Sequence, residues 1–196
     1  PQDDVDDEHV RARATKVRVV AGGPTRTASV RNGLRAVPDS AGIVLVHDAA
    51  RPFAPDALFT AVIAAVNSGA DGAIPGLPLV DTVKMIEVAE VSAIGAVAPR
   101  VVSTPDRASL VSVQTPQAFV ATVLRRAYES QIDSTDDSAL VEAIGGTVIV
   151  VPGDVDNRKI THVEDLVWAR DVLAARTNGR DEVAHWDAPA RADEPA

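Results

Sequence analysis

Residues 43–52 read IVLVHDAARP, and this stretch decides the fold class. Its first four residues are apolar without alternation, as in a strand that is buried on both faces. Two further runs of β-branched residues, 17–21 and 147–151, have the same character. Helix-like stretches separate these runs, so the sequence predicts an α/β protein with a mainly parallel sheet and right-handed crossovers. The expected helices are 29–36, 55–68, 118–130, 135–144 and 161–175, the last opening with Thr161 and Glu164 at capping-box spacing.

One region interrupts the alternation of strands and helices. Residues 72–117 contain five prolines and four strand-like pieces, at 73–80, 83–87, 101–103 and 112–115, but no convincing helix. We interpret this region as a β excursion from the main sheet, with an arm at about 97–120. The length of 196 residues fits one domain, expected at 1–176. Residues 177–196 hold five acids and two arginines without apolar periodicity, which predicts a flexible acidic tail.

Composition excludes several classes of function. The chain has 19 Lys and Arg against 28 Asp and Glu, a net charge of −9, which argues against nucleic acid or an anionic membrane as the main partner. It has no cysteine, so disulfides and thiolate chemistry are excluded. No window reaches the ~18 apolar residues of a membrane span, and the amino end is acidic, unlike a signal peptide. We therefore expect a cytoplasmic protein.

Ligands of open α/β sheets bind beyond the carboxyl ends of the strands. Asp48 comes two residues after the end of the run IVLV, where a carboxylate is suited to hold Mg²⁺ between phosphate oxygens or to accept a hydrogen bond from a ribose hydroxyl. Arg51 is suited to clamp a phosphate, although Asp48 and Arg51 would also be explained by pairing with each other. The neighbouring His47 is more typical of a hydrogen-bonded structural residue.

Two other loops carry candidate binding residues. In the loop 22–29, paired glycines allow close approach of the backbone to a ligand, Arg26 suits a phosphate or carbonyl, and Ser29 suits a base. A plain turn with Ser29 as a helix cap would give the same pattern. Lys159 stands between a predicted strand and a predicted helix, and it is one of only three lysines. A fixed positive charge there is suited to bind phosphate.

Ordered motifs in these loops resemble a known family. The motifs are Gly22-Gly23-x-x-Arg26-x-x-Ser29-Val30-x-x-Gly33-Leu34, Val46-His47-Asp48-Ala49-Ala50-Arg51-Pro52, Asp81-Thr82-Val83-Lys84, Gln114-Thr115-Pro116-Gln117 and Lys159-Ile160-Thr161-x-x-Glu164-Asp165-Leu166. Over about 10–175 the chain resembles the 2-C-methyl-D-erythritol 4-phosphate cytidylyltransferases of the non-mevalonate isoprenoid pathway. The resemblance implies a Rossmann-like nucleotidyltransferase fold and a homodimer formed through the arm. It also implies Mg²⁺-dependent transfer of CMP from CTP to the sugar-alcohol phosphate, with release of pyrophosphate.

The resemblance also implies roles for individual residues. Gly23 and Ser29 would read the cytosine, with Arg26 in the same loop. Asp48 would bind Mg²⁺, and Ala49 would line the pocket through its backbone. The remaining implied roles are Arg51 beside the methylerythritol phosphate, Thr104 reaching across the dimer to the partner's substrate, and Lys159 holding the attacking phosphate.

The sequence departs from the family pattern at two places. The family's first strand, its Gly-rich loop with Arg and Lys for the CTP triphosphate, and the following helix and strand have no counterpart here. We therefore expect the first βαβ unit to be absent from this chain, and the chain by itself to be inactive. Ala121 stands where an Arg that positions the phosphate is frequent, which keeps ribitol 5-phosphate as an alternative substrate. A catalytically inactive binding or dimerisation module is the other alternative.

Overall fold

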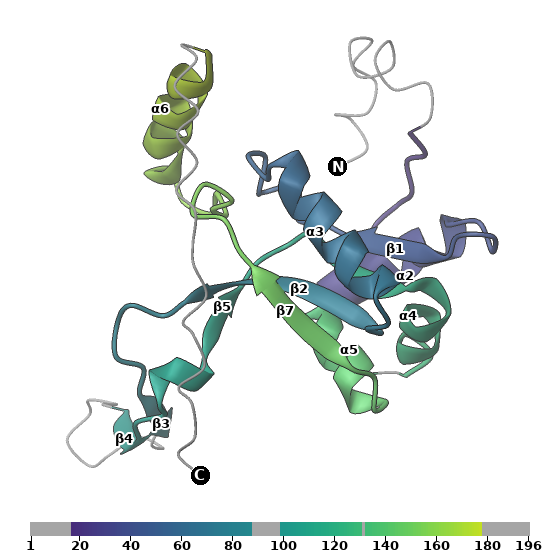
Figure 1. The fold of residues 1–196 in the computed structure, drawn as a ribbon, viewed down its shortest axis with the longest axis horizontal. Helices are drawn as coiled ribbons and strands as arrows, with labels where there is room; N and C mark the ends of the chain where they lie inside the picture. Colours follow the sequence, from purple (N-terminus) through teal and green to yellow (C-terminus); the bar gives the residue numbers. More distant parts are fainter. Residues whose placement is uncertain (1–16, 88–98, 131, 178–196) are drawn as a thin grey trace.

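The computed structural model describes residues 17–87, 99–130 and 132–177. The described part has a mixed sheet with helices on both faces (Figure 1). Its strands are β1 (Ile43–Val46), β2 (Gly72–Pro78), β3 (Met85–Glu87), β4 (Arg100–Ser103), β5 (Val111–Val113), β6 (Gln117–Val120) and β7 (Val148–Pro152). Its helices are α2 (Arg26–Ala36), α3 (Asp56–Asn67), α4 (Ala121–Ala127), α5 (Asp137–Ala143) and α6 (Asp165–Thr177), with a 3₁₀ turn at Arg107–Ser109. The α/β class predicted from the sequence is confirmed.

The sheet is not mainly parallel, which corrects the expectation. β6 lies between β1 and β2 and is antiparallel to both, and β5 is also antiparallel to β2. Only the pairing of β2 with β7 is parallel among the described strands. The excursion after β2 explains this arrangement, because the chain re-enters the sheet from the carboxyl end of β2 and therefore runs in the opposite direction. β1, β2 and β7 still share one direction, so the loops after β1 and β7 leave the same edge of the sheet.

Two apolar clusters form the core, one on each face of the sheet. Val62, Ala65 and Val66 of α3 pack with Ala118 on one face. On the other face Phe119 packs against α2, α4 and α5. Ala118 and Phe119 are successive residues of β6, and successive strand residues point to opposite faces. This strand is therefore buried on both sides, at the centre of the molecule.

Burial of β6 also explains an incorrect helix boundary. The expected helix 118–130 is a strand at Gln117–Val120 followed by α4, which begins at Ala121. A strand that is apolar on both faces has no alternation to distinguish it from the start of a helix. The pairing of β6 with β1 and β2 decides the difference, because it gives the backbone of this segment its hydrogen-bond partners.

The expected strand at 17–21 is wrong. These residues form neither helix nor strand, and the side chains of Val17 and Val19 are 64% and 60% exposed. β-Branched residues favour a strand only where a neighbouring strand supplies backbone partners and a packed surface. No such neighbour lies beside residues 17–21 within the described ranges.

The excursion forms the four strand-like pieces that the sequence predicts. β3 and β4 pair as a separate two-stranded sheet, the hairpin, which Figure 1 shows at the lower left, away from the main sheet. The predicted arm at 97–120 includes β4 and β5, and it also includes β6, which lies in the main sheet. The predicted tail lies outside the described residues except for Thr177, the last residue of α6.

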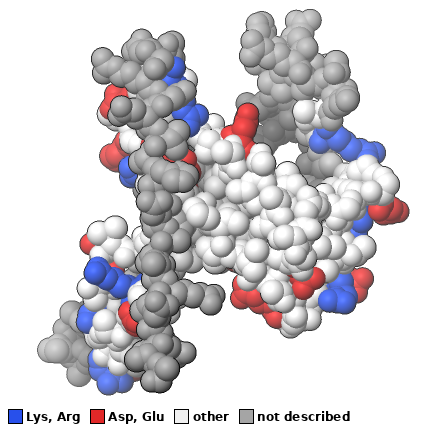
Figure 2. Space-filling view, viewed as in Figure 1, with Lys and Arg blue, Asp and Glu red and all other residues white. Residues whose placement is uncertain are grey.

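The surface seen from the same side is unevenly charged. Its centre, over α3 and β7, is largely free of charged side chains, whereas the hairpin and α6 carry both signs (Figure 2). Within the described residues, no helix is both long and apolar enough to pass through a membrane.

Candidate active site

A cluster of charges surrounds Asp48 at the carboxyl end of β1. Its carboxylate is 18% exposed, and Oδ2 lies 2.9 Å from Nζ of Lys159. Arg26 lies 3.8 Å from Oδ1, and Nε of Arg51 lies 3.9 Å from Oδ2. Three loops that are far apart in the sequence therefore place three cations around one carboxylate. The pairing of Asp48 with Arg51, which was the alternative explanation of these residues, is present, but the contact with Lys159 is closer.

The charges decide the ionisation of Asp48. Burial by itself raises the pKa of this carboxyl, but the hydrogen bond and charge of Lys159, with the charges of Arg26 and Arg51, outweigh burial. The pKa of Asp48 is therefore lower than its ordinary value of 3.8, and the group is an anion at neutral pH. Burial lowers the pKa of Arg51, and the charge of Asp48 opposes this effect.

Backbone contacts hold the Lys159 loop against the Asp48 loop. The N–H of Ile160 donates to the carbonyl of Ala50 at 2.8 Å. Arg51 Nη1 donates to the carbonyl of Asn157 at 2.7 Å. These two contacts on either side of Lys159 fix the backbone of its loop, and the contact with Asp48 holds its ammonium group.

Asp165 organises the other end of the Lys159 loop. Its carboxylate accepts from the backbone N–H groups of Thr161 and His162 and from the guanidinium of Arg158. The two backbone hydrogen bonds are the largest cause that lowers the pKa of Asp165. The expected capping box therefore does not start the helix. α6 begins at Asp165, whose own side chain caps the preceding turn.

The residues Gln114 to Gln117 form a buried support beneath both loops. Thr115 Oγ1 accepts from the backbone N–H of Asp48 at 2.9 Å, and the Thr115 carbonyl accepts from Nδ2 of Asn157 at 2.7 Å. The side chain of Gln114 donates to the carbonyl of Asp154 through Nε2 and accepts from the N–H of Asp154 through Oε1. His47 contacts Thr115 Oγ1 and the Arg51 carbonyl, both at 3.1 Å, which confirms its structural interpretation. The sequence motif contained these residues, but reasoning from the sequence assigned them no role.

The glycine loop before α2 is closed by Ser29. The N–H of Gly23 donates to Ser29 Oγ at 2.9 Å, and Thr25, not Ser29, is the N-cap of the helix. A Cβ on Gly23 would lie 2.4 Å from Cβ of Ala28 and 3.0 Å from its backbone carbonyl carbon. Only glycine therefore fits this close approach of the loop to the helix.

Arg26 is held by a buried acid that sequence reasoning missed. Its guanidinium forms two hydrogen bonds to Asp137, at 3.1 and 2.6 Å, and these bonds are the largest cause that raises the pKa of Arg26. Asp137 is fully buried and also accepts from the hydroxyl of Tyr128. Burial, followed by the contact with Asp137, raises the pKa of Tyr128. The only sequence signal was an acidic pair at positions 136 and 137, at the start of a predicted helix, which is typical of an ordinary helix start.

The structure brings together Arg26, Asp48, Arg51 and Lys159. Gly23 and Ser29 adjoin this cluster through the first turn of α2, and Ala49 follows Asp48 as an exposed residue. Thr104 does not join the cluster. It follows β4 in the hairpin, where its hydroxyl accepts from Nζ of Lys84 at 2.6 Å.

A divalent cation at this site would depend on Asp48. The described residues contain no group of three or more His, Cys, Asp or Glu side chains that could hold a metal. Mg²⁺ in nucleotide enzymes typically uses one or two carboxylates together with substrate phosphates. The single ionised Asp48, partly open to solvent, fits that requirement, whereas Asp137 is already bonded to Arg26 and Tyr128.

Ala121 does not line the charge cluster. It is fully buried in the core, and its N–H donates to the carbonyl of Gly42 at 2.9 Å. Gly42 immediately precedes β1, whereas Asp48 follows the opposite end of this strand. The side chain at position 121 therefore fills the core and is not directed at a phosphate near Asp48.

Comparison with known proteins decides the family. Residues 1–175 match the family model IspD: 2-C-methyl-D-erythritol 4-phosphate cytidylyltransferase. The chain belongs to this family. The resemblance seen in the five motifs is thereby confirmed.

Relatives of the family agree in sequence and in structure. The cytidylyltransferase of Streptomyces avermitilis is 49% identical over 171 residues, which are 87% of this chain and 67% of the relative. That of Nocardia farcinica is 48% identical over 82% of this chain and 65% of the relative. The 4-diphosphocytidyl-2C-methyl-D-erythritol synthase from Anaerococcus prevotii is similar in structure, with a TM-score of 0.75 and 33% identity over 88% of this chain and 74% of that chain.

A second solved structure gives the same result. The cytidylyltransferase from Thermus thermophilus has a TM-score of 0.65 and 36% identity over 78% of this chain and 71% of that chain. The chain spans 56% to 67% of the length of the first four curated relatives that it matches.

Proposed function

We propose that this chain carries the catalytic centre of a 2-C-methyl-D-erythritol 4-phosphate cytidylyltransferase, an enzyme of isoprenoid precursor synthesis. A phosphate oxygen of the sugar-alcohol phosphate attacks the α-phosphorus of CTP. The bond from that phosphorus to the bridging α,β-oxygen breaks, and pyrophosphate leaves with the electron pair. The observation that carries this proposal is the cluster of Lys159, Arg26 and Arg51 around the ionised Asp48.

The cluster suits a reaction that depends on positioning and on neutralising charge. Phosphoryl transfer needs little covalent chemistry from the protein, because the attacking and leaving oxygens must mainly be aligned and their charge stabilised. Lys159 binds the attacking phosphate, and Arg51 lies beside it with its guanidinium fixed on the Asn157 carbonyl. Both cations are anchored before substrate arrives, so little reorganisation opposes the reaction.

The nucleotide binds on the opposite side of Asp48 in this proposal. Gly23 and Ser29 read the cytosine from the loop before α2, and Ala49 lines the pocket through its backbone. Nη2 of Arg26 donates to Asp137 and also lies 3.8 Å from Oδ1 of Asp48. A Mg²⁺ ion on Asp48 would neutralise the phosphate oxygens between the two substrates.

A homodimer completes the proposed enzyme. The hairpin exposes Met85, Ile86, Val101 and Val102, each by more than half of its surface. Apolar side chains gathered on a strand pair that is separate from the main sheet are typical of an interaction surface. In this arrangement the arm carries Thr104 to the substrate of the partner. We also propose that the Gly-rich triphosphate loop of the enzyme lies on a βαβ unit whose motif has no counterpart in these 196 residues.

The burial of Ala121 bears on the choice of substrate. Ribitol 5-phosphate is an alternative substrate because Ala121 stands where an arginine is frequent in the family. Since Ala121 is fully buried and lies at the other end of β1 from Asp48, its identity gives no support to a different phosphate substrate.

Pyrophosphate release tests the proposed reaction. The protein encoded by the complete gene is incubated with CTP, Mg²⁺ and either 2-C-methyl-D-erythritol 4-phosphate or ribitol 5-phosphate. We expect turnover with the methylerythritol compound. Turnover with ribitol phosphate alone would contradict the substrate. CTP binding without turnover of either would instead identify a binding module, and the 196-residue chain measured in parallel tests whether it is inactive by itself.

A further inference from the structure

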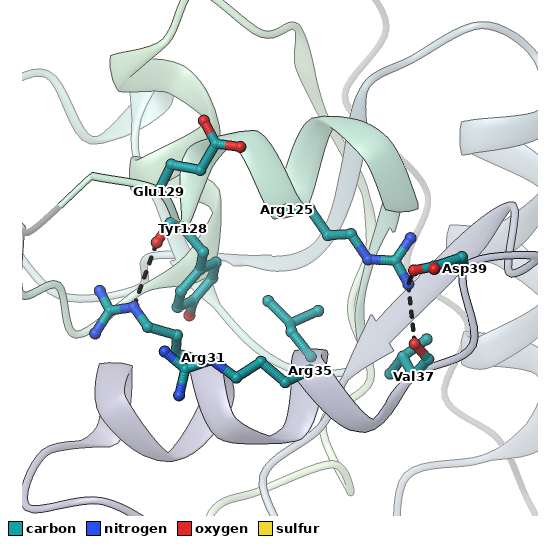
Figure 3. Close-up of a pocket in the computed structure, with 8 residues that line it drawn as sticks. Arg31, Arg35, Val37, Asp39, Arg125, Tyr128 and Glu129 are labelled. Carbon is teal, nitrogen blue, oxygen red and sulfur yellow. Dashed lines mark hydrogen bonds and ion pairs between the residues drawn. The ribbon is translucent and has the colours of Figure 1, made fainter.

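A pocket lies between α2 and α4, and none of the residues of the Asp48 cluster lines it (Figure 3). Its volume is about 380 Å³, which is within the range of about 300–1,000 Å³ that small-molecule sites occupy. Leu34, Val37 and Tyr128 give it apolar walls, and Arg31, Arg35 and Arg125 give it three guanidinium groups. None of these residues has a role in the reaction proposed above.

Main-chain carbonyl groups hold two of the arginines in place. Arg31 donates to the carbonyls of Tyr128 and Ser130, at 3.3 and 3.1 Å. Arg125 donates to those of Val37 and Pro38, at 3.1 and 2.9 Å. Figure 3 shows Arg31 and Arg125 at opposite ends of the pocket, with the side chain of Arg35 extending along α2 toward Arg31. A carbonyl fixes a guanidinium without neutralising it, so both positive charges remain available to a ligand.

The acids that line the pocket leave this charge largely uncompensated. Asp39 is fully exposed and lies 3.9 Å from Arg125, which is a weak ion pair. The carboxylate of Glu129 points away from the arginines (Figure 3). Fixed cations next to an apolar wall match an organic anion that has an apolar body.

Tyr128, which forms one wall of the pocket, connects the pocket to the Asp48 cluster. The Tyr128 ring lies 5.8 Å from the guanidinium of Arg31, and its hydroxyl donates to Asp137. Asp137 in turn holds Arg26, which lies 3.8 Å from Asp48. An anion that pairs with Arg31 attracts the guanidinium that lies over the Tyr128 ring, so binding changes the contacts of the first member of this chain.

We propose that the pocket between α2 and α4 binds a small organic anion, a carboxylate or phosphate on an apolar body, and that occupancy is transmitted to Arg26 through Tyr128 and Asp137. The inference is independent of the proposed reaction, because both of its parts are measured without turnover.

Titration of the protein with phenyl phosphate and benzoate, followed by NMR, tests the binding. We expect saturable shifts of the Leu34 and Val37 methyl signals, with much weaker effects from benzamide, which lacks the charge, and from inorganic phosphate, which lacks the apolar body. Equal binding of benzamide or inorganic phosphate would overturn the ligand class. The absence of saturable shifts at these methyls would overturn the site.

Substitutions identify which charges are responsible. Arg125→Gln should weaken phenyl phosphate binding about tenfold or more, because a hydrogen bond to a charged group is lost. Arg35 is exposed and donates to the side chain of Asn32, so Arg35→Gln leaves folding intact and should weaken binding about two- to fivefold. Arg126→Gln is the matched control, since Arg126 is exposed on the same helix as Arg125 and does not line the pocket. Equal weakening in the control would contradict a specific site.

The Arg26 side chain reports the second part of the proposal. We expect its Nε–Hε signal to shift as phenyl phosphate saturates the pocket, and we expect Tyr128→Phe to abolish this shift while the Leu34 shifts persist. An Arg26 signal that stays constant in the wild type, or that shifts equally in Tyr128→Phe, would overturn the transmission to Arg26.

Discussion

Two strands of equal length, β1 and β4, show how differently this chain uses similar residues. Both have four residues and contain adjacent aliphatic side chains, IVLV in β1 and RVVS in β4. β1 packs within the main sheet and ends at the charge cluster, whereas every residue of β4 is exposed. Local preference makes both segments strands, but only the neighbours of β1 make it part of a core. We therefore expect substitutions in and after β1 to change activity or stability more than substitutions in β4.

Asp48→Asn should have the largest effect. In the protein encoded by the complete gene, loss of the charge removes the anion that contacts Lys159 and that we propose as the Mg²⁺ ligand, so we expect kcat to fall by orders of magnitude. The variant should stay folded, with only a modest loss of stability at neutral pH. Asp56→Asn, at an exposed position in the first turn of α3, is the control. Wild-type turnover in Asp48→Asn would contradict the role of the cluster.

Lys159→Ala should act mainly on the sugar phosphate. A hydrogen bond to a charged group contributes about 1.5–3 kcal/mol, so KM for that substrate should rise roughly ten- to hundredfold. Initial rates at varied concentrations of each substrate separate the effect from one on CTP. Arg170→Ala removes an exposed cation from α6 and should change neither KM. A change confined to the KM of CTP would contradict the proposal that Lys159 binds the sugar phosphate.

Asp137→Asn tests whether the buried support matters more than surface contacts. Arg26 would lose its charged partner while the shape is kept, and we expect the free energy of unfolding to fall by about 1–3 kcal/mol. Chemical denaturation measures this change. Asp133→Asn removes the charge of an exposed acid that accepts from the hydroxyl of Thr25, and it should change stability little. If the two variants were equally stable, the buried contact of Asp137 would contribute no more to stability than the exposed contact of Asp133.

The lowered pKa of Asp48 makes the stability of the protein depend on pH in the acid range. Because the pKa of Asp48 is lower in the folded protein than its ordinary value of 3.8, the unfolded chain takes up the proton first as the pH falls. Asp48 therefore contributes stability at pH values above 3.8 and loses this contribution as the pH falls through its lower folded-state pKa.

Unfolding measured from about pH 5 downward tests this sign. Asp48→Asn should lose stability less steeply than the wild type. Glu87→Gln, which breaks the exposed ion pair with Arg100 in the hairpin, should follow the wild-type curve. A wild-type slope in Asp48→Asn would contradict the lowered pKa.

Val101→Asp should have the smallest effect on stability and a clear effect on assembly. Val101 is 54% exposed in the hairpin, so we expect a change within about 0.5 kcal/mol in the fold itself. If the hairpin forms the dimer, light scattering should show a shift toward the monomer mass. Ile132→Asp places the same charge at a residue that is 56% exposed outside the hairpin, and it should leave the mass unchanged. A dimer that survives Val101→Asp would place the interface elsewhere.

Sequence reasoning succeeded where a signal was local. The run at Ile43–Val46, the helix after Pro55 and the strand pieces of the excursion each carry their pattern within a few residues, and each is present. It failed where the outcome depended on a distant partner. Residues 17–21 have strand composition without a strand partner in the described structure, and Gln117–Val120 is a strand because β1 and β2 lie on either side.

The candidate site divides in the same way. The sequence by itself predicted a phosphate site from Asp48, Arg51 and Lys159 in loops after strands, and its ordered motifs indicated the family that the family model shows. Only the tertiary structure decided that Lys159 contacts Asp48, that Asp137 holds Arg26, and that Thr115 supports the Asp48 loop. A motif fixes which groups are available within one loop. Contacts between loops depend on sheet order and burial, and these are properties of the whole chain.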